Sequence, residues 1–222
     1  MRDFAWIYEH ALNRKGSVKT LEASLPQPKS VAELKKVGDD RYLSEMSRRV
    51  FRAGLKYSMV DGKWPAFEEV FFGFDPLKLV LMSDEMLENT LQDTRIIRHW
   101  GKVKSIRANA LMVKELAEAH GSFGRFLADW PVDDIIGLWQ LLAKQGRQLG
   151  GNSAAAFLRM VGKDTFLLTN DVVAALVAQG IVDKKVTSKA EMRAAQAAFN
   201  QWHKESDRPL CQISRLLSYC VD

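Results

Sequence analysis

Residues 148–173 read QLGGNSAAAFLRMVGKDTFLLTNDVV. The pattern predicts a tight turn at Gly150 and Gly151, a helix after it, and a second break at residues 162–164. A polar turn at residues 169–171 then opens onto another apolar helix. This second turn holds a single carboxylate, Asp171, so the stretch combines a glycine turn and an acidic group, each at the start of a helix.

The glycine turn is a candidate phosphate-binding hairpin. Glycines let backbone N–H groups approach a phosphate, and the following helix presents the positive end of its dipole. The candidate DNA-binding residues belong to the turn or flank it as cations: Gln148, Gly150, Gly151, Asn152, Ser153, Lys144 and Arg147. A plain helix–turn–helix connection explains the glycines equally well. A β-branched residue at Gly150 is expected to weaken phosphate binding, because it cannot adopt a positive φ cheaply.

Asp171 also has two interpretations. It can be the N-terminal cap of the helix that begins near Val172, a common role for aspartate. It can instead be a catalytic carboxylate that stabilises developing positive charge and orients water, as carboxylates do in sugar hydrolysis.

Composition places the chain among ordinary globular proteins. Its 222 residues are 47% hydrophobic and 27% charged, enough for one domain with a sizeable core. It contains no apolar run long enough to span a membrane and no signal-peptide pattern at its start. The two cysteines, Cys211 and Cys220, are expected to be reduced thiols. We therefore expect a cytoplasmic protein, without a membrane association, that acts as a monomer.

The charge distribution favours a polyanionic partner on one part of the surface. The formal net charge is +5. Residues 57–94 depart from this balance, with 2 Lys and Arg against 8 Asp and Glu. Because this acidic segment would repel phosphate, we expect it to face away from a nucleic acid.

Helical periodicity runs through almost the whole chain, which predicts an all-α fold. Two capping-box sequences, Ser30 to Glu33 and Ser188 to Glu191, are each followed by helix formers. Apolar stripes at helical spacing mark further helices near residues 43–55, 102–119, 135–146, 172–178, 192–202 and 210–219. Residues 14–30 contain two prolines and many polar side chains, and we expect them to form a loop.

The spacing within residues 148–173 resembles the helix-hairpin-helix DNA glycosylase superfamily. There the hairpin ends in a Thr/Ser-Ala pair and a catalytic aspartate follows some seventeen residues later; here Asp171 lies seventeen residues after Ala154. The hairpin pattern of the family usually reads Pro-Gly-Val-Gly, so Gln148 replaces its first glycine and Gly150 keeps the second. Some members form a Schiff base with a lysine where this chain has Asn152. The resemblance therefore implies a monofunctional glycosylase with Asp171 as its catalytic residue.

Residues 95–110, RIIRHWGKVKSIRANA, closely resemble the signature segment of the 3-methyladenine DNA glycosylase I family. Upstream matches are Phe74-Asp75-Pro76, Ala53-Gly54-Leu55 and Leu43 to Met46, and the segment from Leu210 resembles the final core helix. The resemblance covers residues 39–120 best. It implies a fold of two helical lobes flanking a cleft, formed by one glycosylase-like domain over residues 1–222.

Departures from the family bear on the site. The resemblance implies a base pocket built from Tyr57, Arg49 and Trp6, where Tyr57 keeps the stacking aromatic. Arg49 stands where the family has a glutamate, and it cannot accept a hydrogen bond from an adenine amino group. Phe4 stands where the family has a zinc ligand, and no His-x-x-x-Cys pair occurs near Asp222. We therefore predict no metal and no cofactor.

The predicted function is removal of alkylated purines resembling 3-methyladenine from double-stranded DNA, by hydrolysis of the N-glycosidic bond in base excision repair. The alternatives are a non-catalytic DNA-binding or damage-recognition protein of the same fold, with Asp171 only a cap, and an interaction protein that no longer binds DNA.

Overall fold

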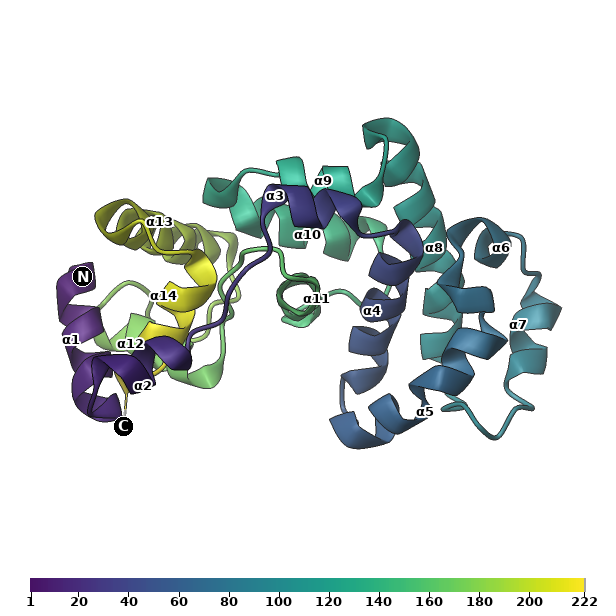
Figure 1. The fold of residues 1–222 in the computed structure, drawn as a ribbon, viewed down its shortest axis with the longest axis horizontal. Coiled ribbons are helices and arrows are strands. Elements are labelled where there is room, and N and C mark those ends of the chain that lie inside the picture. Colours follow the sequence, from purple (N-terminus) through teal and green to yellow (C-terminus); the bar gives the residue numbers. More distant parts are fainter. Residues whose placement is uncertain (222) are drawn as a thin grey trace. The chain divides into compact units, whose positions relative to one another are not determined.

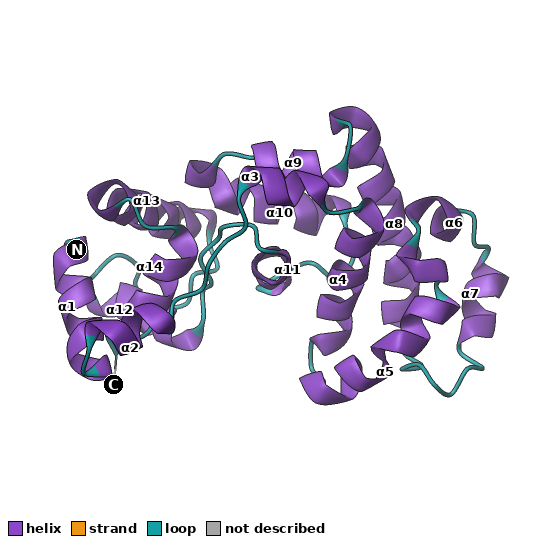
Figure 2. Ribbon diagram, in the orientation of Figure 1, coloured by secondary structure: helices purple, strands orange, loops and turns teal. Residues whose placement is uncertain are grey.

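The computed structural model describes residues 1–221. Over these residues the chain forms fourteen α-helices and two short 3-10 helices, and contains no β-strand (Figure 2). The prediction of an all-α fold is confirmed. The chain divides into two compact units: a terminal unit of residues 1–29, 131–138 and 162–221, and a central unit of residues 30–130 and 139–161. The boundary at residue 138 falls inside one helix, α10 (Ile135–Gln145).

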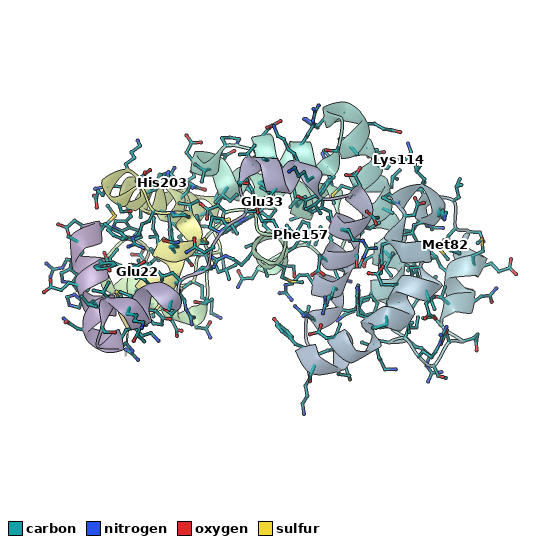
Figure 3. All side chains as sticks on the ribbon, viewed as in Figure 1. Glu22, Glu33, Met82, Lys114, Phe157 and His203 are labelled. Atoms are coloured by element: carbon teal, nitrogen blue, oxygen red, sulfur yellow. The ribbon has the colours of Figure 1, made fainter. Side chains whose placement is uncertain are left out.

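The central unit is built around two long helices that pack on each other, α4 and α8 (Figure 1). Its helices are α3 (Val31–Lys36), α4 (Asp39–Arg52), α5 (Tyr57–Val70), α6 (Pro76–Val80), α7 (Asp84–Thr90), α8 (Trp100–His120), α9 (Phe123–Asp129), α11 (Ser153–Val161), most of α10 (Ile135–Gln145) and the 3-10 helix Phe72–Phe74. The stripe of Leu43, Met46 and Val50 on α4 is buried. Phe157 of α11, labelled in Figure 3, is also fully buried, and its ring lies 6.5 Å from that of Phe123.

The terminal unit is organised by α14, which contacts α1, α12 and α13. Its elements are α1 (Phe4–Lys15), α2 (Val18–Ala23), the 3-10 helix Val132–Asp134, α12 (Asn170–Ala178), α13 (Lys189–Ser206) and α14 (Leu210–Leu217). Four apolar side chains of α14 are fully buried, and Phe166 stacks on Phe199 with ring centroids 4.0 Å apart. The first and the last of the described residues, 1 and 221, both belong to this unit (Figure 1).

The expected loop over residues 14–30 is interrupted by a helix, and the prediction of a continuous loop is wrong. Ser17 caps α2 by accepting a hydrogen bond from the N–H of Thr20. Leu21 and Leu25 are buried. Six helical residues are too few for an apolar periodicity to stand out in the sequence, and the helix is held by its cap and by the burial of these two leucines.

Both capping boxes form as predicted, at Ser30 with Glu33 and at Ser188 with Glu191. The break at residues 162–164 has a specific role as well. The carboxylate of Asp164 accepts hydrogen bonds of 2.8 Å from the N–H groups of Leu210 and Cys211, so it caps the N-terminus of α14.

Candidate active site and nucleic-acid interface

The predicted hairpin is the turn between α10 and α11, residues 146–152. Gly146 has no space for a side chain, because a Cβ there would lie 2.6 Å from Leu149 Cδ1 and 2.8 Å from the carbonyl oxygen of Leu142. Leu149 is buried and anchors the turn, whereas Gln148, Gly150, Gly151 and Asn152 are exposed. The turn therefore presents its polar backbone to solvent around one apolar anchor.

Positive φ angles occur at Gln148 (63°) and Gly151 (56°), but not at Gly150. A Cβ at Gly150 would meet nothing within 4 Å. The expectation that Gly150 needs a positive φ is therefore wrong, and Gly151 is the glycine that has one. Gln148 adopts the left-handed conformation at the position where the family has a glycine, which costs a residue with a side chain about 1–2 kcal/mol.

Asn109 of α8 clamps the hairpin. Its Oδ1 accepts a 2.7 Å hydrogen bond from the N–H of Arg147, and its Nδ2 donates a 3.1 Å bond to the carbonyl of the same residue. Asn109 is fully buried. The sequence did not lead us to predict that Asn109 holds the hairpin, although Asn109 belongs to the Asn-Ala pair that ends the signature segment.

Cations surround the hairpin. Lys144 and Arg147 are both exposed, as expected for residues that would meet phosphates, and Ser153 begins α11 with its side chain largely buried. A groove of about 780 Å³ opens beside the turn, where Arg147 and Gln148 face Lys104 and Arg107 of α8. Lys104 and Arg107 were not singled out as binding residues from the sequence.

The turn that follows α4, residues 53–56, is held by Lys102 of the signature segment. Its buried ammonium donates hydrogen bonds of 3.1 Å to the carbonyl of Phe51 and 2.6 Å to that of Ala53. Burial, together with the nearby charge of Arg49, lowers the pKa of Lys102 from its ordinary value. The Nε atom of Arg49 is buried and has no hydrogen-bond partner among the described residues. Lys102 and Arg49 therefore place two positive charges close to each other at the end of α4.

Tyr57 is the first residue of α5 and is 56% exposed. The guanidinium of Arg52 lies 4.9 Å from the centre of its ring, a cation–π geometry. Asp61 holds Arg52 through bonds of 2.7 Å and also pairs with Arg48. Burial alone would raise the pKa of Asp61, but hydrogen bonds from Arg52 and Arg48 outweigh it and lower the pKa. The exposed ring of Tyr57 therefore has a defined orientation and a free face for stacking.

Asp171 is the second residue of α12, in the terminal unit, and its side chain is exposed. The cap of α12 is Thr169, whose hydroxyl accepts from the N–H of Val172. The interpretation of Asp171 as the cap is therefore wrong. The segment before α12 is fixed by Ser214 of α14, whose hydroxyl bonds both the N–H and the carbonyl of Leu167. Among the described residues Asp171 forms no hydrogen bond or ion pair, so its carboxylate is available to a ligand.

Trp6 lies on α1, also in the terminal unit. Its ring stacks on His10 with centroids 3.6 Å apart, and the guanidinium of Arg2 lies 5.5 Å from its centre. A shallow pocket on this unit includes Trp6, Ala178 and Gln179. The indole is thus partly exposed and held between polar neighbours.

The residues present do not fit the zinc site of the family. Phe4 stands at the N-terminal ligand position, where it begins α1. Over residues 1–221 no group of three or more His, Cys, Asp or Glu side chains could hold a metal ion. Cys211 and Cys220 are not joined in a disulfide, and burial raises the pKa of Cys220 to about 11. No helix in this range is long and apolar enough to cross a membrane.

Residues 34–187, more than half of the chain, match the family model described as methyladenine glycosylase. The chain belongs to the methyladenine glycosylase family. A segment of 59 residues is 41% identical to DNA-3-methyladenine glycosylase 1 of Escherichia coli K12, and it spans 27% of this chain and 32% of that relative. The sequence match thus extends over about a third of the length of the curated relative.

Two solved structures show the same fold. One is 3-methyladenine DNA glycosylase I from Staphylococcus aureus, with a TM-score of 0.51 and 22% identity over 62% of this chain and 80% of that one. The other is the 8-oxoguanine glycosylase/lyase of Methanocaldococcus jannaschii in complex with DNA, with a TM-score of 0.55 and 13% identity over 96% of both chains. The predicted helix-hairpin-helix DNA glycosylase fold is confirmed.

Proposed function

We propose that this protein is a monofunctional DNA glycosylase that removes alkylated purines resembling 3-methyladenine from double-stranded DNA. The observation that carries the proposal is an exposed, unpaired Asp171 in the first turn of α12, in a chain of the methyladenine glycosylase family. Thr169 already caps that helix, so the carboxylate is not needed to start it.

In the proposed reaction the damaged nucleotide is extruded from the duplex and its glycosidic bond breaks. The C1′–N bond breaks with its electron pair going to the purine, and the carboxylate of Asp171 stabilises the positive charge that develops on the sugar. A water molecule then forms the new C1′–O bond and gives up one proton to Asp171, which releases it to solvent. An N-methylated cationic purine leaves as a neutral base and needs no acid catalyst.

The other proposed residues bind rather than react. Tyr57 and Trp6 offer aromatic faces on which a base can stack. Asn152 stands where lyase members of the superfamily carry a Schiff-base lysine, so the product is an abasic site in an uncut strand. The hairpin from Gln148 to Ser153, with Lys144 and Arg147, binds backbone phosphates.

A second candidate is a non-catalytic damage-recognition protein of the same fold. Arg49 favours it, because its guanidinium donates hydrogen bonds but accepts none and repels a cationic base. The two candidates differ in whether the glycosidic bond is broken, and both require DNA binding.

The decisive experiment measures base release from methylated DNA by the wild-type protein and by Asp171→Asn. We expect release by the wild type and a loss of at least about a hundredfold in the variant, with DNA affinity retained. DNA binding without release by the wild type would establish the recognition protein instead. Neutralising Lys144 or Arg147 should lower affinity for all sequences alike and flatten the log–log salt dependence by about one unit each.

A further inference from the structure

Helix α8 separates two grooves of opposite charge. The groove beside the hairpin, which we call the basic groove, has a volume of about 780 Å³ and includes Lys104 and Arg107 of α8 and Arg147 of the hairpin. None of the residues that line it is acidic. Lys104, Arg107 and Leu111 are spaced by three and four residues, so they lie on one face of the helix.

The other groove, which we call the acidic groove, has a volume of about 630 Å³ and the reverse balance of charge. Four carboxylates line it against two cations: Asp39, Asp40, Asp75 and Glu118 against Arg41 and Lys114. Lys114 is paired with Glu118 and Arg41 with Glu68, which leaves an acidic excess. One helix therefore presents an electropositive groove next to the hairpin and an electronegative groove further along, and a polyanion is favoured only in the first.

Two cations of the basic groove, Arg107 and Lys104, have side-chain contacts within the protein before any ligand binds. Arg107 donates a 2.7 Å hydrogen bond to the carbonyl of Met82, a residue labelled in Figure 3. It also forms an ion pair with Asp84. The ammonium of Lys104 lies 4.9 Å from the centre of the Trp100 ring. Lys104 is exposed and has no acidic partner among the described residues. Its charge is therefore available to an external anion.

The basic groove is also connected to the hairpin. The two hydrogen bonds of Asn109 fix the backbone of Arg147 to α8, five residues along the helix from Lys104 and two from Arg107. Gln148 lines the groove as well, and its Nε2 lies 4.0 Å from the position that a Cβ on Gly101 would take. A strand bound at the hairpin would therefore reach Lys104 and Arg107 in a defined register.

We propose that the basic groove binds a run of DNA backbone phosphates next to the phosphates bound by the hairpin, with Lys104 as its main contact. The inference rests on the proposed function and extends it to a longer footprint. From Lys104 to Leu111 the helix rises about 10 Å, which matches about three phosphates at 3.4 Å of duplex axis each. Leu111, 44% exposed, offers an apolar surface to the carbons of the sugars.

The test is a scan of duplexes in which one phosphate at a time is replaced by a neutral methylphosphonate. Each duplex carries one stable abasic-site analogue to fix the register, and affinity is measured by fluorescence anisotropy. The variants are Lys104→Gln and, as a matched control, Lys114→Gln, which neutralises a lysine on the same helix in the acidic groove. Both substitutions keep most of the side-chain length.

For the wild type we expect two adjacent groups of sensitive phosphates. Lys104→Gln should weaken binding about three- to tenfold, flatten the log–log salt dependence by about 0.9, and abolish sensitivity in one group only. Lys114→Gln should leave the profile unchanged. The proposal that the basic groove binds phosphates is overturned if the wild type shows a single sensitive group, or if the Lys104→Gln profile equals that of Lys114→Gln. DNA binding at the hairpin would then still stand. No binding to any duplex overturns both the groove and the proposed function.

Discussion

Removal of the Asn109 side chain tests whether the hairpin has to be held by α8 in order to bind DNA. Asn109→Ala deletes two hydrogen bonds, of 2.7 and 3.1 Å, to the backbone of Arg147. Each such bond contributes about 0.5–1.5 kcal/mol, and the variant also leaves a cavity at a fully buried site. We expect a loss of about 2–3 kcal/mol. Because Arg147 is exposed, its freed N–H and carbonyl can turn to water, so the loss should act mainly as local opening of the hairpin.

The assay compares urea unfolding, followed by circular dichroism, with DNA affinity under conditions where the protein stays folded. Asn200→Ala is the matched control. Asn200 also makes two hydrogen bonds, at 2.8 Å each, with Gln196 and with the carbonyl of Asp133 in the terminal unit. Asn109→Ala should weaken DNA binding about tenfold, and Asn200→Ala should change only stability. Equal DNA affinity in the two variants would refute the reasoning.

Gln148→Gly should stabilise the protein by about 1 kcal/mol, because it removes a left-handed residue with a side chain; an unchanged urea midpoint would contradict this. Arg49→Glu should raise the release rate of a cationic methylpurine relative to a neutral substrate by on the order of tenfold, since a carboxylate attracts the cation that the guanidinium repels. The pKa of Glu22 is lowered, chiefly by its hydrogen bond from Arg208, so this pair stabilises the fold above the ordinary pKa of 4.5, and that contribution is lost as the pH falls through the lowered value. In Glu22→Gln the melting temperature should therefore fall less on acidification than in the wild type. Identical profiles of melting temperature against pH in the two proteins would contradict a stabilising role for the Glu22–Arg208 pair.

The helices that the sequence predicted correctly are those with long apolar stripes or clear caps. The expected helix near residues 102–119 is α8, Trp100–His120, and both capping boxes form. Prediction failed where structure depends on contacts between distant residues. The helix α2 is a single short element held by the burial of Leu21, and Asp164 caps a helix that begins 46 residues later. Neither interaction produces a recognisable pattern in the sequence around the residues concerned.

For the candidate site, the sequence located the turns and helix starts better than it predicted their local geometry. Spacing placed Asp171 in the first turn of a helix, which the structure confirms, but the cap two residues earlier, Thr169, was overlooked. The glycine pattern identified the hairpin and assigned the positive φ to Gly150, whereas Gln148 and Gly151 adopt it. A non-glycine residue in the left-handed region is rare enough that no sequence rule would choose it. It is sustained here by the packing of Leu149 and the clamp from Asn109.

The signature segment holds neither the proposed catalytic carboxylate nor the hairpin, and the contacts of α8 give it a physical role. At the start of the helix, Lys102 binds two carbonyls at the end of α4 and so fixes the turn before Tyr57. Two turns later, Asn109 fixes the hairpin. Both interactions need buried polar groups at a set spacing on one rigid helix, because an unsatisfied group at either position would cost more than the bond contributes. The signature therefore specifies a scaffold for two elements that would bind DNA, and Lys104 lies between its two anchoring residues.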